Sequence, residues 1–250
     1  MNKKIKFKDK KFIWHPFTKT SKSYDPIVIS SAINEKIIDV DGNEYIDLIS
    51  SWWVNIHGHC KKEILTVINK QLKKFEQVLF ADFTHQPAVE LAEKLSEITP
   101  NKLNRTFYSD NGSTAVEIAM KVAVQYWYNS GVKKNKFVAM QGGYHGDTLG
   151  AMSVGFTSGF YQPFKEIIPN NFFFSFPENW EGKNDIEKNE QQSLKEIDDL
   201  LSENLEQIAA VIIEPLIQGA SGMRICRKEY LNKAMQKFRD AGVIIIFDEV

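Results

Sequence analysis

Cysteine is scarce in this chain. Only two cysteines, Cys60 and Cys226, occur among its 250 residues, too few for the disulfide framework of a small secreted protein. No apolar run approaches the roughly 20 residues that a membrane-spanning helix needs. The first eleven residues are basic, but the apolar stretch of a secretory signal does not follow them. We therefore expect a cytoplasmic protein without a membrane partner, whose first residues form a solvated, disordered tail.

A charge excess of one sign is lacking too. Lysine and arginine number 31 against 32 aspartates and glutamates, so the formal net charge is -1. A chain this balanced has no overall attraction to nucleic acid. The glycine-rich G-x-x-x-x-G-K-[ST] loop of nucleotide hydrolases is also missing, and we find no internal repeats. A nucleic-acid-binding protein and a nucleoside triphosphatase are both disfavoured.

Hydrophobic spacing predicts an α/β fold. Residues 27–49 alternate apolar and polar positions around a turn at Gly42, which predicts a β-hairpin or meander. Helical spacing then predicts helices near 61–75, 87–98, 113–128 and 228–240. We expect strands at 106–108, 136–140, 209–213 and 243–247, the last two buried on both faces, and a polar surface excursion with one helix at 177–204. The pattern indicates a mostly parallel sheet, with an N-terminal segment over residues 1–60 and a large domain over 61–250.

Three predicted strand ends carry candidate binding residues, because ligands of open α/β sheets bind at the carboxyl ends of the strands. The first leads through Gly112 and Ser113 into a helix, whose free N–H groups and dipole would favour a phosphate. An ordinary N-cap with a glycine in the turn explains the same residues.

The second strand end is rich in glycine and carries Tyr144, which offers a flat face for an aromatic cofactor; a tight turn with a half-buried tyrosine is the alternative. The third ends in Asp248, a carboxylate that needs a cationic partner when buried. A protonated pyridine nitrogen or a metal ion would serve, and Glu214 supplies a second carboxylate on the same side. A helix start that binds an anion, an aromatic plate and a buried aspartate together match the requirements of pyridoxal phosphate.

Several motifs resemble the class III, fold-type I aminotransferases, which depend on pyridoxal phosphate. They are Asp-Val-Asp-Gly at 39–42, Ser-Asp-Asn-Gly-Ser at 109–113 and Phe-Asp-Glu at 247–249. Further motifs are similar to the biotin-pathway members of that family, which aminate 8-amino-7-oxononanoate with S-adenosylmethionine. These are Trp-His-Pro-Phe-Thr at 14–18, Ser-Trp-Trp at 51–53, His-Gly at 57–58, Tyr-His-Gly-Asp-Thr at 144–148 and Glu-Pro-Leu-Ile-Gln-Gly-Ala at 214–220. The resemblance spans residues 14 to 249, nearly the whole chain.

The resemblance implies roles for individual residues. Gly112 and Ser113 would bind the cofactor phosphate, and Asp248 would pair with the pyridine nitrogen. Tyr144 would line the substrate pocket beside the ring. Trp52 would form a wall of that pocket; a core tryptophan, the alternative reading, fits Trp53 better.

At one position the chain departs from the family. Phe17 replaces a tyrosine associated with recognition of the keto substrate, so substrate affinity or donor discrimination is expected to differ. The family's members are homodimers, which implies the same assembly here.

The resemblance also implies that these 250 residues lack the catalytic lysine. It places the Schiff-base lysine downstream of Asp248, whereas the chain ends at Val250, so we assign no catalytic residue within it. We expect the 250 residues alone not to carry out transamination. The competing hypothesis is a non-catalytic protein, either a truncated product or a module that binds cofactor or a partner without turnover.

A histidine-rich stretch contains His57, His59 and Cys60. Its spacing matches no standard structural zinc pattern, and a fourth ligand is not evident. We expect a loop without a metal ion.

Overall fold

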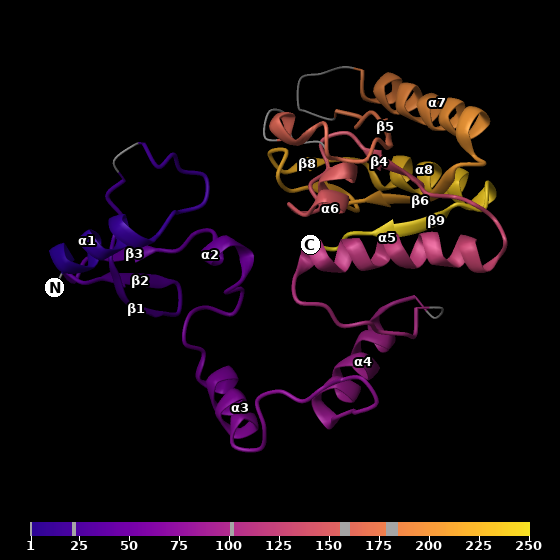
Figure 1. Ribbon diagram of the computed structural model, residues 1–250. Coiled ribbons are helices and arrows are strands. Elements are labelled where there is room, and N and C mark those ends of the chain that lie inside the picture. The colour runs from indigo at the N-terminus through magenta and orange to yellow at the C-terminus, as the bar shows by residue number, and fades with distance from the viewer. Residues whose placement is uncertain (1, 22–23, 101–102, 156–160, 179–184) are drawn as a thin grey trace. The chain divides into compact units, whose positions relative to one another are not determined.

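The computed structural model describes residues 2–21, 24–100, 103–155, 161–178 and 185–250. The chain divides into two compact units, Met1–Asn101 and Lys102–Val250 (Figure 1). The division into an N-terminal segment and a large domain at residue 60 stays a prediction. No helix among the described residues is long and apolar enough to cross a membrane.

Unit 1 is built around a small antiparallel sheet. Strands β1 (Ile29–Ile33), β2 (Lys36–Asp39) and β3 (Glu44–Ile46) pair in the order β1-β2-β3, which confirms the predicted meander. Gly42 turns the chain between β2 and β3 with φ at +86°. The Asp39 carboxylate closes that turn, because its Oδ1 accepts from the N–H groups of Asp41 and Asn43 at 2.9 and 2.8 Å.

The helices of unit 1 are α1 (Asn2–Phe12), α2 (Ser50–Trp53), α3 (Lys62–Leu72) and α4 (Gln86–Ile98). The predictions for α3 and α4 are confirmed, although α3 ends before Phe75. The prediction of a disordered tail was wrong, since residues 2–12 form α1. Lysine is a good helix former, and a helix with every residue at least partly exposed gives no apolar pattern to detect.

The short element α2 has an unusual backbone. Its four residues have positive φ angles of 48, 48, 67 and 69°. Left-handed backbone costs roughly 1–2 kcal/mol per L-residue and occurs mostly at single positions. Four in succession therefore require strong tertiary support.

Unit 2 contains a four-stranded parallel sheet in the order β5-β4-β6-β9. Its strands are β4 (Lys136–Met140), β5 (Phe172–Phe174), β6 (Ile208–Ile213) and β9 (Ile244–Phe247), and a two-stranded hairpin is formed by β7 (Ile217–Gln218) and β8 (Arg224–Ile225). The helices are α5 (Gly112–Asn129), α6 (Leu149–Val154), α7 (Ile186–Asn204) and α8 (Lys228–Asp240), with a 3₁₀ turn η1 (Gln162–Phe164). The predicted mostly parallel sheet is confirmed.

Helices cover both faces of this sheet, and Figure 1 shows α5 and α7 on opposite sides. α5 and α6 pack with one set of strand residues, including Phe137 and Ile212. α7 and α8 pack with the alternate set, including Val138 and Val211. All six residues of β6 are buried, as predicted. The prediction that β9 is buried on both faces was wrong, because among the described residues β9 pairs with one strand, β6, and is only half-buried.

Two further predictions need correction. Residues 103–108 form neither helix nor strand; β-prone residues such as Thr106–Tyr108 become a strand only where another strand pairs with them. The single helix predicted within 177–204 is confirmed as α7, but its placement on the surface was wrong, because α7 packs on the sheet with Ser193 and Ile197 fully buried. Because most residues around these positions are polar, the sequence contains little indication that this helix has a buried face. Residues 179–184 of the predicted range lie outside the described residues.

Candidate active site

The carboxyl ends of β4 and β6 meet at a topological switch point. β4 leads into α6 on one face of the sheet, whereas β6 leads through the β7–β8 hairpin into α8 on the other face. Ligands of open α/β sheets bind at such a point, outside the carboxyl ends of the strands. The turn after β4 carries Tyr144 and His145, β6 is followed by Glu214, and β9 is followed by Asp248.

Asp248 has a charged or polar partner that the sequence did not reveal. Its Oδ2 lies 2.7 Å from Nδ1 of His145, whose side chain is 1% exposed. The Asp248 carboxylate accepts a hydrogen bond from His145 in the tautomer that carries a proton on Nδ1. The two residues are 103 positions apart, and pairing of β4 and β9 with β6 brings them together. The sequence offered one indication of this partner, namely the histidine that directly follows Tyr144.

Glu214 connects two of the strand-end turns. It is 4% exposed, and its two oxygens accept from the N–H groups of Tyr144 and Gly219, each at 3.0 Å. Burial raises the pKa of this carboxyl above its usual value, although both hydrogen bonds oppose that rise. Glu214 therefore fixes the turn after β4 to the turn after β6.

The side chain of Tyr144 is also held in place. Its hydroxyl donates to Oδ2 of Asp147 at 3.0 Å. Burial, followed by that hydrogen bond, raises the pKa of Tyr144 to about 12. The phenol thus keeps its proton at neutral pH, and its role beside a cofactor ring stays a prediction.

The start of α5 reaches the same turn. Asp147 donates its backbone N–H to the hydroxyl oxygen of Ser113 at 3.1 Å. Gly146 has φ at +119°, and a Cβ atom there would clash with that hydroxyl. Only glycine therefore allows the turn and the helix start to approach this closely.

Both sequence interpretations of the α5 start are compatible with its geometry. Asn111 caps the helix by accepting from the N–H of Thr114 at 3.0 Å, and Thr114 completes a capping box. Within the described part of the chain, no acceptor is assigned to the N–H groups of Gly112 and Ser113. Those two groups, the Ser113 hydroxyl proton and the helix dipole remain available to an anion.

The β7–β8 hairpin supports the glycine-rich turn from the other side. The carbonyl oxygen of Gln141 accepts from Nε2 of Gln218 at 3.1 Å and from the Arg224 guanidinium at 3.0 Å. Gly142, with φ at +86°, leaves no room for a Cβ beside that guanidinium, and its carbonyl accepts from the Ser221 hydroxyl. Of these hairpin residues, Gln218 lies in the family motif at 214–220, whereas no sequence pattern indicated the contacts of Ser221 and Arg224.

The remaining candidates, Trp52 and Phe17, lie in unit 1. Their rings stack with centroids 5.7 Å apart and an interplanar angle of 23°, and the two residues are 64% and 73% exposed. Trp53 is 43% exposed, so the expectation that it belongs to the core is wrong within this unit. Trp52, which precedes Trp53 in α2, stacks on Phe17 instead.

The histidine-rich stretch has another partner. Nε2 of His59 lies 2.9 Å from Oδ2 of Asp47, while Cys60 is exposed. Over the described residues, no group of three or more His, Cys, Asp or Glu side chains is arranged to hold a metal ion.

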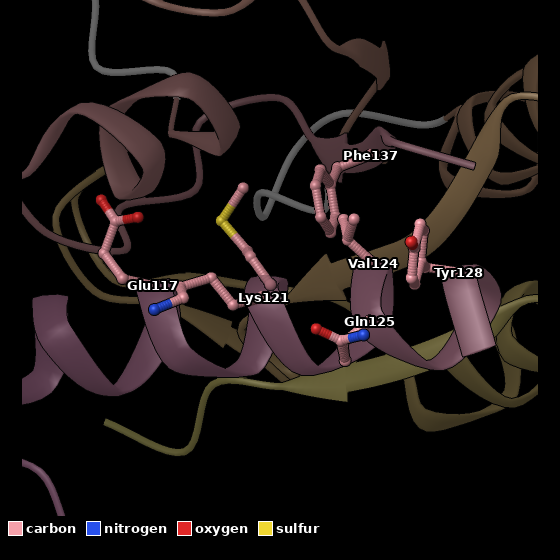
Figure 2. Close-up of a pocket in the computed structure, with 7 residues that line it drawn as sticks. Glu117, Lys121, Val124, Gln125, Tyr128 and Phe137 are labelled. Atoms are coloured by element: carbon pink, nitrogen blue, oxygen red, sulfur yellow. The ribbon is translucent and has the colours of Figure 1, made fainter. Parts of the chain in front are cut away.

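A groove of about 530 Å³ runs along α5. Figure 2 shows Lys121, Val124 and Tyr128 of α5 and Phe137 of β4 among the side chains that line it. Its one carboxylate, Glu117, already accepts from the N–H groups at the start of α6, from Gly150 at 2.7 Å. The groove contains none of the strand-end residues, so the candidate chemistry belongs to the switch point.

The switch point thus offers three separate binding functions. The start of α5 supplies N–H donors for an anion, Tyr144 supplies an aromatic ring, and the Asp248–His145 pair supplies a carboxylate. A ligand with a phosphate, a flat ring and a basic ring nitrogen would use all three.

Comparison with known proteins identifies the family. The aminotransferase class-III family matches residues 19–250. A curated relative from Synechococcus elongatus, adenosylmethionine-8-amino-7-oxononanoate aminotransferase, is 44% identical over 95% of this chain. The chain covers 56% of that relative, so it spans about half the length of the protein it matches.

Solved structures agree with this assignment. The crystal structure of adenosylmethionine-8-amino-7-oxononanoate aminotransferase from Methanocaldococcus jannaschii has a TM-score of 0.89 and 34% identity, covering 100% of this chain and 55% of that one. A PLP-bound amine transaminase from an uncultivated Pseudomonas species has a TM-score of 0.86 and 26% identity, covering 96% of this chain and 56% of that one. The α/β fold predicted from the sequence is confirmed as that of the fold-type I transaminases. The chain therefore belongs to the class III aminotransferases.

Proposed function

We propose that this chain forms the cofactor-binding part of an aminotransferase of biotin biosynthesis. The whole enzyme would use pyridoxal phosphate to transfer an amino group from S-adenosylmethionine to 8-amino-7-oxononanoate, giving 7,8-diaminononanoate. The observation that carries the proposal is the partly buried Asp248–His145 pair at the switch point, beside the free N–H groups of α5. The names of the relatives supply the substrates.

The residues of the switch point fit this cofactor. Gly112 and Ser113 would hold its phosphate through N–H groups, a hydroxyl and the helix dipole. Asp248, oriented by His145, would hold a proton on the ring nitrogen, and Tyr144 would lie against the ring. The bound cofactor supplies an electron sink for the bonds at the substrate carbon. The protein's part is to bind it, orient it and keep its ring nitrogen protonated.

Unit 1 would contribute substrate contacts. Trp52 and Phe17 present stacked, exposed rings, which suit the alkyl chain of a long keto acid. Homodimeric assembly and a cytoplasmic location, both expected from the sequence, belong to this proposal as well.

The function is tested with a full-length enzyme that contains these 250 residues. Purified enzyme with pyridoxal phosphate should form 7,8-diaminononanoate from 8-amino-7-oxononanoate and S-adenosylmethionine. Replacing S-adenosylmethionine with other amino donors identifies the natural one. Cofactor binding without amino transfer from any donor would instead support a non-catalytic binding module.

A first prediction concerns the phosphate site. Ser113→Ala should weaken cofactor binding by about 1–3 kcal/mol, the range for a hydrogen bond to a charged group. The remaining N–H groups should keep part of the affinity. Titration of the cofactor-free enzyme with pyridoxal phosphate measures the effect. Ser130→Ala, at the opposite end of α5, is the matched control, and an equal affinity in the two variants would contradict the phosphate site.

A second prediction concerns substrate choice. Phe17→Tyr should change the KM for 8-amino-7-oxononanoate more than the KM for the amino donor, because it adds a hydroxyl beside Trp52. Steady-state kinetics with each substrate varied in turn measures both constants. Phe12→Tyr in α1, which is also exposed, controls for adding a hydroxyl elsewhere. Unchanged constants for both substrates would remove Phe17 from the proposed pocket.

A further inference from the structure

The left-handed turn α2 needs an explanation that the proposed function does not supply. It consists of Ser50, Ser51, Trp52 and Trp53, all with positive φ. Serine and tryptophan have no special tolerance for this region, unlike glycine or asparagine. Strained backbone of this kind persists only where surrounding contacts hold it, and such places are often functional.

One carboxylate holds the turn. Oδ2 of Asp47 accepts from the Ser51 hydroxyl at 2.7 Å and lies 2.9 Å from Nε2 of His59. The side chain of Asp47 is 5% exposed. A backbone hydrogen bond from Ser51, the Ser51 hydroxyl and His59 together lower the pKa of Asp47 to about 2. The carboxylate is therefore ionised at neutral pH, when each of these hydrogen bonds is strongest.

The other end of this contact is anchored in the meander. The backbone of His59 forms two hydrogen bonds with Asn34, with N···O distances of 2.7 and 3.0 Å. Asp47 follows β3 directly. Asp47, Ser51 and His59 thus tie the left-handed turn to the sheet of unit 1.

The left-handed turn places the Trp52 side chain against Phe17. Its indole stacks on Phe17, and both rings remain largely exposed. The hydroxyl that Asp47 accepts from belongs to the residue immediately before Trp52. Releasing Ser51 would free the turn to relax toward ordinary backbone angles, which would redirect the Trp52 side chain away from Phe17.

We propose that Asp47 is a positioning residue, which holds the left-handed turn through Ser51 and His59 and thereby fixes Trp52 against Phe17. The inference rests on the proposed function in one respect, namely that Trp52 and Phe17 contact substrate. It assigns a role to Asp47 and His59, which lie outside the substrate contacts, and it explains why the strained turn is kept.

A rescue experiment in the whole enzyme tests the proposal. Asp47→Ala should lower kcat/KM for 8-amino-7-oxononanoate by about 10-fold or more, the scale of a small misplacement near a substrate, with cofactor affinity unchanged. Asp47→Ala/Ser51→Gly should recover part of the loss, because glycine adopts the left-handed region without strain. Asp47→Ala/Ser31→Gly, with the glycine in β1, is the matched control and should recover none.

A second measurement reports on the turn itself. The near-ultraviolet circular dichroism of Trp52 is isolated as the difference between each protein and its Trp52→Phe version. Asp47→Ala should change this difference spectrum, and Ser51→Gly should partly restore it. An unchanged spectrum, or a loss of thermal stability with neither a kinetic change nor a rescue, would overturn the proposal. A changed and rescued spectrum combined with normal substrate kinetics for Trp52→Ala would uphold the role of Asp47 and remove Trp52 from the proposed substrate pocket.

Discussion

Asp248→Asn is expected to lower turnover by about 100-fold or more, the scale for removing one preorganised electrostatic contact at a reacting centre. The amide carries no charge, so it cannot hold a proton on the ring nitrogen of the cofactor. His145, which donates to Asp248 from 2.7 Å, can still donate to the amide oxygen. The fold and most of the cofactor affinity should therefore survive.

Two measurements separate these effects. Turnover is followed with both substrates saturating, and cofactor affinity is followed by titration of the cofactor-free enzyme. Asp240→Asn, at the end of α8, where the side chain accepts from Gln236 of the same helix, is the matched control. Near-normal turnover in Asp248→Asn would remove Asp248 from the proposed role, as would a variant that fails only to bind the cofactor.

The second large effect is expected at Glu214. Glu214→Ala leaves the partly buried N–H groups of Tyr144 and Gly219 without their acceptor. A fully buried donor without an acceptor costs about 1–3 kcal/mol, so two partly buried donors should lower the free energy of unfolding by about 1–4 kcal/mol. Denaturant unfolding measures this change. A loss no larger than that of Glu203→Ala, an exposed position in α7, would contradict the bridging role of Glu214.

The same carboxyl gives a pH dependence with a defined sign. Burial raises the pKa of Glu214 above 4.5 in the folded state, so folding favours the protonated form. Its contribution to stability is fully present below that ordinary pKa and is lost as pH rises through the raised value. The free energy of unfolding, measured from pH 4 upward, should show this loss in the wild type but not in Glu214→Gln. Equal pH profiles would contradict the raised pKa.

The regular elements were predicted well from the sequence because their local signals are strong. Continuous apolar runs marked β6 and β9, and glycine after a periodic stretch marked the end of α8. Ser113 and Asp248 were placed at the ends of predicted elements for the same reason. Their spatial neighbourhood was inferred only from the general rule about strand ends.

Contacts between distant residues were not predictable in this way. The hydrogen bond between His145 and Asp248 depends on the strand order, which no local pattern encodes. The left-handed turn at Ser51 depends on Asp47 and His59, which hold a backbone that serine and tryptophan do not favour by themselves. In both cases tertiary contacts override local preference, so a single sequence carries little signal for them.

The strand order has a consequence for how the protein becomes functional. Asp248 reaches His145 only when β9 has paired with β6 and β6 with β4, so the binding groups are assembled by the last strand of the described sheet. A ligand that needs them all recognises only the completed sheet and draws the folding equilibrium toward it. At a free cofactor concentration 100 times the dissociation constant, this linkage contributes about 2.7 kcal/mol. Supply of the cofactor during synthesis would then act as a folding aid, and vitamin limitation would reduce the amount of folded enzyme as well as its activity.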